Sequence, residues 1–276
     1  MKNLKAPCDL HLHSYYSDGN LSPQALVQRA HELDLVAVSI TDHDTILGQE
    51  ESLRAGKKYG VEVLTGIEFS MREDDLSIHI IGYLIDPLNP ALVKNVDKLG
   101  QARVGRAKMI VDKLTAYGLK IPFQDILESA GEGTIGRPHI AQVLVKRGLV
   151  RSIQEAFGRY IRDGGPCYVP KTVLPSEKVF ELIKEAGGVA VWAHPGKNIL
   201  RRDLLERLCR FGIAGIEVWH PHQDLDIERK VHAAAQEKGL IMTGGSDFHF
   251  REAMQSDMGE VTAPYETVTA LKKAAI

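Results

Sequence analysis

The chain has 276 residues, of which 44% are hydrophobic and 25% charged, a composition typical of a soluble globular protein with a sizeable core. Its formal net charge of -2 argues against a general nucleic-acid coat protein, although it permits a local basic patch. Three widely spaced cysteines argue against a disulfide framework and favour a reducing, cytoplasmic location. Residues 1–7 have no apolar leader and no apolar run is long enough to span a membrane. Nothing indicates an obligate protein partner.

Short apolar runs alternate with helical patterns along most of the chain. Strands are expected at the start of 8–19 and at 36–40, 61–64, 77–85, 189–193, 215–219 and 240–243. Helices are expected from Ser22-Pro23 onwards and at 45–59, 91–116, 123–129, 137–147, 152–161, 176–187, 200–211, 224–238 and 266–275. This alternation predicts an α/β fold with a parallel sheet and right-handed crossovers. We expect a barrel formed by 1–99 and 173–276, interrupted by a helical insertion at 100–172.

Histidines and carboxylates gather at or just past the strand ends. His11 and His13 are two apart in an extended strand, so both imidazoles leave the same face. The candidate metal ligands are His11, His13, Asp18, His43, Glu68, His79, His194, Asp247 and His249. The carboxyl ends of the strands of a parallel barrel meet on one face, where nine donors suit two or three ions, with Glu68 as a bridge. Taken alone, His79 fits a core histidine better than a ligand, but the whole set favours a metal site.

These residues resemble the motif set of the PHP (polymerase and histidinol phosphatase) phosphoesterases. The matching groups are Asp9-Leu10-His11-x-His13 with Asp18-Gly19, Ile40-Thr41-Asp42-His43-Asp44, Gly66-Ile67-Glu68, Ala193-His194-Pro195 and Gly245-Ser246-Asp247-x-His249. The resemblance covers about 1–99 and 173–255, and implies a distorted TIM-like barrel of seven strands with a trinuclear site. It implies three ligand sets: His11, His13, Glu68 and Asp247; Glu68, His79 and His194; and Asp18, His43 and His249. No ligand position of the family is replaced, which counts against a purely structural member.

The insertion indicates which members of the family this chain resembles most. It contains Gly136-Arg137-Pro138-His139-Ile140-Ala141, and is similar to bacterial stand-alone members that act as 3′,5′-nucleotide bisphosphate phosphatases and as 5′→3′ exonucleases on short RNA. A site of several ions lowers the pKa of a bridging water, so that hydroxide attacks phosphorus while the ions neutralise the phosphoryl oxygens. We expect hydrolysis of the 3′-phosphate of nucleoside 3′,5′-bisphosphates, with short 5′-phosphorylated RNA as a second substrate. Manganese is the preferred metal, with iron and zinc as alternatives.

The charge of the insertion indicates how such substrates bind. Residues 101–172 hold 12 basic and 6 acidic residues, a net +6, against 22 and 30 in the remainder, a net -8. A basic lid above an acidic metal site suits a polyanion, and Arg103, Arg106 and Arg137 are the candidate phosphate contacts because a guanidinium matches phosphate in geometry. The alternative is an ordinary solvated helical face. His222 ends a strand outside the ligand set, and is interpreted as a proton donor to the leaving oxygen or a phosphate contact; a structural role is an equal alternative.

Three other functions remain open. A histidinol-phosphate-type phosphomonoesterase would share the metal site, but the insertion counts against it. A metal-dependent amidohydrolase commonly bridges its ions with a carbamylated lysine, and no lysine stands at a suitable strand end. A metal-stabilised binding module without activity is disfavoured by the intact ligand set.

Overall fold

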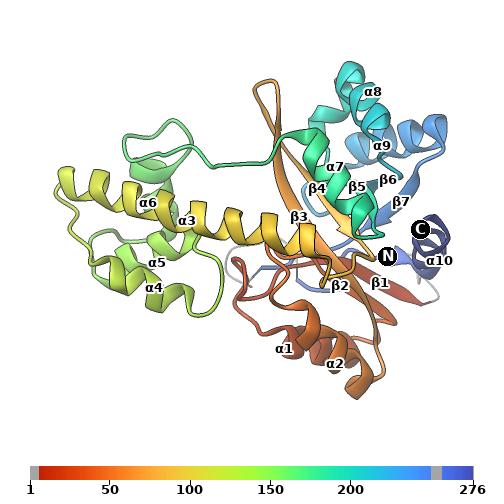
Figure 1. Cartoon of the computed structure of the whole chain (residues 1–276), viewed down its shortest axis with the longest axis horizontal. Coiled ribbons are helices and arrows are strands. Elements are labelled where there is room, and N and C mark those ends of the chain that lie inside the picture. The colour runs from red at the N-terminus through yellow and green to blue at the C-terminus, as the bar shows by residue number, and fades with distance from the viewer. Residues whose placement is uncertain (1–5, 250–256, 276) are drawn as a thin grey trace.

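The computed structural model describes residues 6–249 and 257–275 (Figure 1). Within these residues, eight strands form one sheet in the order β7-β6-β5-β4-β3-β2-β1-β8. Their bounds are β1 Pro7–Leu12, β2 Ala37–Ile40, β3 Glu62–Glu73, β4 Leu76–Tyr83, β5 Val189–Ala193, β6 Gly215–Trp219, β7 Ile241–Gly244 and β8 Ala263–Pro264. A bridge between Leu12 and Phe248 brings the two ends of the sheet together. The predicted α/β barrel is confirmed, and the two-residue β8 adds to the seven strands expected. Two predictions lie partly outside the described residues. One concerns the absence of an apolar leader at 1–7, and the other concerns the end of the motif region near residue 255.

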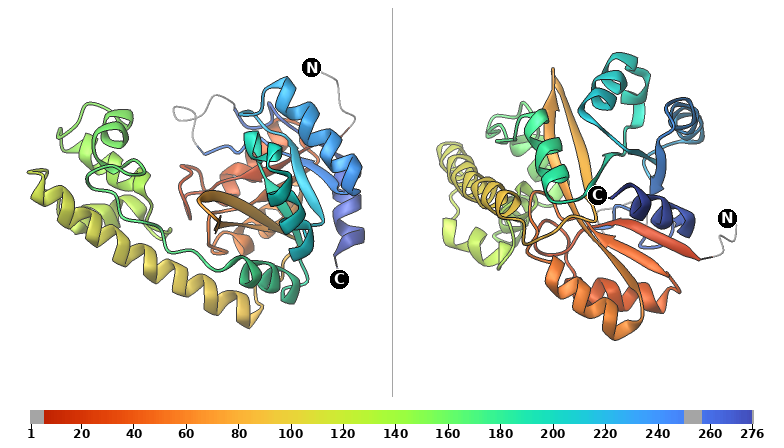
Figure 2. Two further views of the ribbon diagram at one scale, coloured as in Figure 1. Left: turned by 90° about the horizontal axis from the view of Figure 1, so that it is seen from above. Right: turned by 45° about the vertical axis from the view of Figure 1, so that its right-hand side comes forward.

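Helices surround the sheet on its outer side (Figures 1 and 2). They are α1 Pro23–Glu32, α2 Gln49–Tyr59, α7 Ser176–Glu185, α8 Arg202–Phe211, α9 Leu225–Lys238 and α10 Tyr265–Ala274. Ser22 caps α1 as expected, because its side chain accepts the N–H of Ala25. The helix expected at 200–211 begins two residues later, as α8, and a 3₁₀ turn at Gly196–Leu200 precedes it. Within the described residues, none of the helices has the length and apolarity that crossing a bilayer requires.

The β3–β4 hairpin departs from the predicted parallel sheet. β4 pairs antiparallel with both β3 and β5. Only Asp74 and Asp75 separate β3 from β4, and a link this short cannot make the crossover that a parallel pair needs. The chain therefore turns back at once, with Asp74 at a φ angle of 52°. The prediction of a wholly parallel barrel is wrong at this hairpin, which extends beyond the neighbouring strands (Figure 1).

Residues between β4 and α7 form a helical body beside the barrel (Figure 2). Its helices are α3 Pro90–Ala116, α4 Phe123–Ala130, α5 Arg137–Lys146 and α6 Ile153–Ala156, followed by a π-helical turn at Phe157–Ile161. α3 is continuous across the predicted boundary between residues 99 and 100. Beyond that point the helices pack around an apolar cluster that runs from Ala107 to Val169 and is separate from the clusters of the barrel. Residues 162–175, the return segment, lead back to the barrel.

A turn of the insertion rests on the loop that follows β1. The N–H of Thr134 donates to the carbonyl of Tyr16 at 2.8 Å. A Cβ atom at Gly133 would lie 2.2 Å from the carbonyl oxygen of Tyr15, so only glycine allows this approach. The insertion is thus held near the end of the barrel at which β1 terminates.

The barrel closes where the chain after β7 passes over β1. The carboxylate of Asp9 accepts the backbone N–H of Ser246 at 2.9 Å and its hydroxyl at 2.6 Å. The N–H of His13 donates to the carbonyl of Phe248 at 2.9 Å. A Cβ atom at Gly245 would lie 2.5 Å from the backbone nitrogen of His11. This close contact fixes the segment that carries Asp247 and His249 against the strand that carries His11.

We expect Gly245→Ala to lower the free energy of unfolding by about 1–3 kcal/mol, because the added methyl group meets backbone that cannot yield easily. Thermal unfolding measures the effect as a fall in Tm of several degrees. Gly100→Ala is the control, since nothing lies within 4 Å of a Cβ atom at that position inside α3 and alanine favours helix by about 0.5–1 kcal/mol. A Tm for Gly245→Ala equal to that of the wild type would contradict this account of barrel closure.

Candidate metal centre and adjoining pocket

Histidine and carboxylate side chains from seven barrel segments converge at one end of the barrel. The overlapping sets are His13, Asp18, His43 and His249; His11, His194 and Asp247; His11, His13 and Glu68; His43, Glu68 and His79; and His11, Glu217 and His220. In each set one candidate ligand atom per residue lies within 4.8 Å of the others. The structure therefore brings all nine predicted ligand residues into one cluster.

Glu68 lies at the centre of this cluster and is fully buried. Its two carboxylate oxygens face different histidines. Oε2 is 2.7 Å from His43 Nδ1, 3.4 Å from His13 Nε2 and 3.5 Å from His11 Nε2. Oε1 is 2.9 Å from both His79 Nδ1 and His194 Nε2. A carboxylate that shares its oxygens between two groups of nitrogen donors has the geometry of a bridge between neighbouring ions.

Asp247 and Asp18 supply the other two carboxylates among the predicted ligands. Asp247 Oδ1 is 3.2 Å from His11 Nε2 and 3.0 Å from His13 Nε2. Asp18 Oδ1 is 3.2 Å from His249 Nε2. Asp247 also has a φ angle of 50°, an unusual backbone conformation for a residue with a side chain, and such strain is concentrated at functional sites.

Two of the predicted ligands do not sit at the end of a parallel strand. Glu68 lies within β3, which runs on past the end predicted for this strand, whereas His79 lies within β4, as the predicted strand at 77–85 already placed it. They still face the cluster because the hairpin continues past the barrel and turns antiparallel, so that the middle of β3 lies beside His43 in the loop after β2. His79 has a 25% exposed side chain that contacts Glu68 and His194, unlike a core histidine.

The donor atoms themselves fit divalent ions. Seven buried side-chain atoms make no well-directed hydrogen bond in the described part of the chain, and five of them belong to this cluster: His11 Nε2, His13 Nε2, Asp18 Oδ1, His43 Nδ1 and Glu68 Oε2. Unsatisfied buried polar atoms are costly, and a shared cation would satisfy these. Burial opposes ionisation of Glu68, but the imidazoles of His43, His79 and His11 outweigh it and hold the pKa of its carboxyl well below the usual range. Burial, with His249 and His43, lowers the pKa of His13 to about 3, so a neutral ring offers its lone pair.

Glu217 and His220 belong to the cluster although they are not among the predicted ligands. Glu217 is fully buried; Oε1 lies 3.0 Å from His11 Nδ1 and Oε2 accepts the N–H of His194 at 2.7 Å. It thereby orients both histidines. His220 Nε2 is 3.2 Å from Asp247 Oδ2. Two features of the sequence could have pointed to them. Glu217 is an acid in the middle of an apolar strand, and His220 directly follows that strand, as His194 follows its own.

His222 lies at the rim of the cluster and is exposed. Its ring centroid is 5.3 Å from that of His220. With His79, His194 and other residues it lines a small cavity of about 230 Å³. The side chain is therefore free to meet a molecule that enters from solvent.

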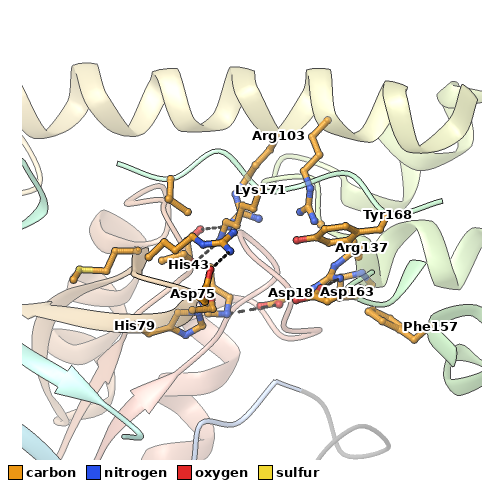
Figure 3. Close-up of a pocket in the computed structure, with 18 residues that line it drawn as sticks. Asp18, His43, Asp75, His79, Arg103, Arg137, Phe157, Asp163, Tyr168 and Lys171 are labelled. Atoms are coloured by element: carbon orange, nitrogen blue, oxygen red, sulfur yellow. Dashed lines mark hydrogen bonds and ion pairs between the residues drawn. The ribbon is translucent and has the colours of Figure 1, made fainter. Parts of the chain in front are cut away.

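A larger pocket, of about 500 Å³, lies between the cluster and the insertion (Figure 3). Its lining includes His43, His79 and Asp18 on the barrel side and Arg103, Arg106, Arg137, Tyr168 and Lys171 on the insertion side. All three predicted arginines thus lie in one pocket. Lys171 is a further cation that the sequence analysis did not single out.

Each arginine is held by neighbouring groups. Arg103 Nη2 is 2.6 Å from Asp44 Oδ2. Arg106 is largely buried and donates from Nε to the carbonyl of Val169 at 2.8 Å. Arg137 donates to the carbonyl of Ile161 at 3.1 Å and forms an ion pair with Asp163. Its guanidinium carbon lies 5.6 Å from the ring centre of Phe157 and of Tyr168, so aromatic faces also hold it.

A barrel with a rim of converging histidines and carboxylates is an architecture of metal-dependent hydrolases. Residues 9–159 match the PHP domain model. The chain is 35% identical to a 3′,5′-nucleoside bisphosphate phosphatase of Chromobacterium violaceum over 249 residues, covering 88% of this chain and 87% of that protein. It is also 35% identical to a 5′-3′ exoribonuclease of Haemophilus influenzae over 248 residues, covering 88% and 89%.

A solved structure from Bifidobacterium adolescentis, described as a metal-dependent phosphoesterase, superimposes with a TM-score of 0.89 at 31% identity and covers 98% of this chain and 96% of that chain. The chain belongs to the PHP domain family. The resemblance drawn from the motifs is thereby confirmed. The individual ligand assignments stay predictions.

Proposed function

We propose that this protein removes the 3′-phosphate from nucleoside 3′,5′-bisphosphates, with short 5′-phosphorylated RNA as a second substrate. Phosphoester hydrolysis is the reaction named for its relatives in C. violaceum and H. influenzae. The observation that carries the proposal is the pocket in which three arginines and Lys171 adjoin the histidine and carboxylate cluster. In such a pocket one phosphate of the substrate can lie at the cluster, while the arginines and Lys171 bind a second phosphate.

The cluster would hold two or three divalent ions, with manganese as the proposed metal. Following the family motifs, the first ion would take His11, His13, Glu68 and Asp247, the second Glu68, His79 and His194, and the third Asp18, His43 and His249. When bound, such ions lower the pKa of water and neutralise the charge of a phosphoryl group. Glu217 supports this arrangement because its carboxylate contacts Nδ1 of His11 and the backbone N–H of His194, and so fixes both residues.

The remaining roles belong to side chains around the ions. Arg103, Arg106 and Arg137 would hold the phosphate that is not hydrolysed, since charge-assisted contacts to phosphate are strong. His222, exposed at the rim, would donate a proton to the leaving oxygen. Residues 100–172 would act as a substrate lid on the barrel formed by 1–99 and 173–276.

A phosphate-release screen tests the proposal. Metal-stripped protein is loaded with manganese, iron or zinc in turn and offered histidinol phosphate, nucleoside monophosphates, 3′,5′-bisphosphates and short 5′-phosphorylated RNA. We expect the highest kcat/KM on a 3′,5′-bisphosphate, with the 3′-phosphate released. Preference for a monophosphate such as histidinol phosphate, or metal binding without turnover on any substrate, would refute it.

A further inference from the structure

The two segments that join the insertion to the barrel meet at one buried carboxylate, that of Asp44. Asp44 Oδ2 is 2.6 Å from Arg103 Nη2 of α3 and 2.7 Å from Lys171 Nζ of the return segment. Oδ1 accepts the N–H of Ser70 on β3 at 3.0 Å. Figure 3 shows Arg103 and Lys171 reaching from the insertion side towards His43. A single side chain thus ties α3, the return segment and the barrel together.

Asp44 is also joined directly to the cluster. It follows His43 in sequence, and its own N–H donates to the carbonyl of Glu68 at 3.0 Å. The side chain is 2% exposed and the φ angle is 54°. Asp44 is therefore a buried residue with an uncommon backbone conformation, unlike a typical residue of a surface loop. The backbone of Asp44 is thus fixed against the cluster, whereas its side chain holds the insertion.

The charges at this point favour a bound anion. Two cations share one carboxylate, which leaves a net +1 beside the pocket. Within the described residues, Arg103 and Lys171 have few other anchors: Arg103 donates to the carbonyl of His43 at 3.5 Å, and Lys171 donates to the hydroxyl of Ser70. Without the Asp44 carboxylate, both cations would keep only these contacts to neutral groups.

We propose that Asp44 is a positioning residue that fixes Arg103 and Lys171 at the pocket wall, and so gives the enzyme its preference for substrates with a second phosphate. This inference rests on the proposed function. Asp44 itself touches neither the substrate nor the ions. Its effect passes through the two cations, which it holds at a constant distance from the cluster while the phosphate to be cleaved lies on the ions.

The test is Asp44→Asn, because asparagine tolerates a positive φ angle and its amide oxygen still accepts the N–H of Ser70. We expect kcat/KM on adenosine 3′,5′-bisphosphate to fall about tenfold, or about 1.4 kcal/mol, mainly through KM. The rate on 4-nitrophenyl phosphate and the metal content should stay within about twofold of the wild type, since that ester has no second phosphate. In metal-free protein, residues 100–106 and 165–172 should exchange amide hydrogens faster, whereas β5 and β6 should not.

Two further variants control the interpretation. Asp75→Asn removes another carboxylate from the same pocket; Asp75 is fully exposed and pairs only loosely with Arg72, at 3.6 Å. It should not reduce the preference for the bisphosphate. Lys171→Ala should reproduce the selective loss, and adding Asp44→Asn to it should cost less than Asp44→Asn alone, because coupled residues are not additive.

Several results would overturn the inference. Equal losses on both substrates, with loss of metal, would mean that Asp44 acts on the ions through His43. No change in substrate preference or in amide exchange would make Asp44 a packing residue. If the wild type cleaves 4-nitrophenyl phosphate but not the bisphosphate, the proposed function fails instead; the amide exchange of residues 100–106 and 165–172 would still show whether Asp44 fixes the insertion.

Discussion

Glu68→Gln is expected to lose bound metal and activity together. Each oxygen of Glu68 faces a different group of histidines, so loss of the negative charge weakens two ion positions at once. Stabilisation of transition-state charge by metal ions is worth several kcal/mol, and each 1.4 kcal/mol is a factor of ten. We therefore expect phosphate release to fall by about a thousandfold, and the metal content to fall by at least one ion per chain.

Elemental analysis of the purified proteins and a phosphate-release assay measure the two effects. Glu73→Gln is the matched control: Glu73 lies on the same strand but binds Ser176 and Arg207, away from the cluster. Chelation of the wild type should abolish activity, and a divalent transition metal should restore it. Full activity in the metal-free protein, or full metal content in Glu68→Gln, would contradict the assignment.

Arg137→Ala is expected to reduce kcat/KM for adenosine 3′,5′-bisphosphate by roughly 10- to 150-fold. Arg137 opens α5 after Gly136 and faces the pocket, so the helix N-terminus and the guanidinium both favour an anion there. A charge-assisted contact is worth about 1.5–3 kcal/mol, which gives this range at about 1.4 kcal/mol per tenfold. A simple aryl phosphate, which has no second phosphate, should lose little.

The comparison of two substrates decides between the possible roles of Arg137. Equal losses on both would mean that it supports the reacting phosphate or the fold. No loss on either would leave it as part of a solvated face. Arg159→Ala is the control for long-range charge: Arg159 is 62% exposed and pairs with Glu155 of the same helical segment, outside the pocket. It should leave both substrates almost unchanged.

Most of the candidate site could be predicted because its residues follow short buried strands. His11, His194 and Asp247 each stand at or after such a strand, and the geometry of a barrel then brings them together. The alternation of strands and helices likewise gave the barrel and its helical interruption. Helices were also expected at 152–161 and 224–238, and the structure adds that Ser152 and Asp224 cap them by accepting backbone N–H groups.

The features that could not be predicted depend on contacts between residues that are distant in sequence, or on the geometry of a turn. The direction of β4 depends on the length of one turn, and hydrophobic patterning does not report direction. Glu217 interacts with His11 across the barrel, a contact between residues far apart in sequence that no local pattern reveals. Lys171 resembles any surface lysine until its pairing with Asp44 is seen. Local periodicity thus finds the strands, whereas the partners of buried charges emerge only from the closed fold.

The cluster draws its donors from both sides of the insertion, and this has a consequence for synthesis of the protein. On the ribosome, His11, His13 and Glu68 emerge first, whereas Asp247 and His249 emerge only after the whole insertion and β5 to β7 have been made. A nascent chain carries an incomplete donor set that cannot impose the final geometry on an ion. Selection of the proposed metal would therefore be a late event, made by the closed barrel.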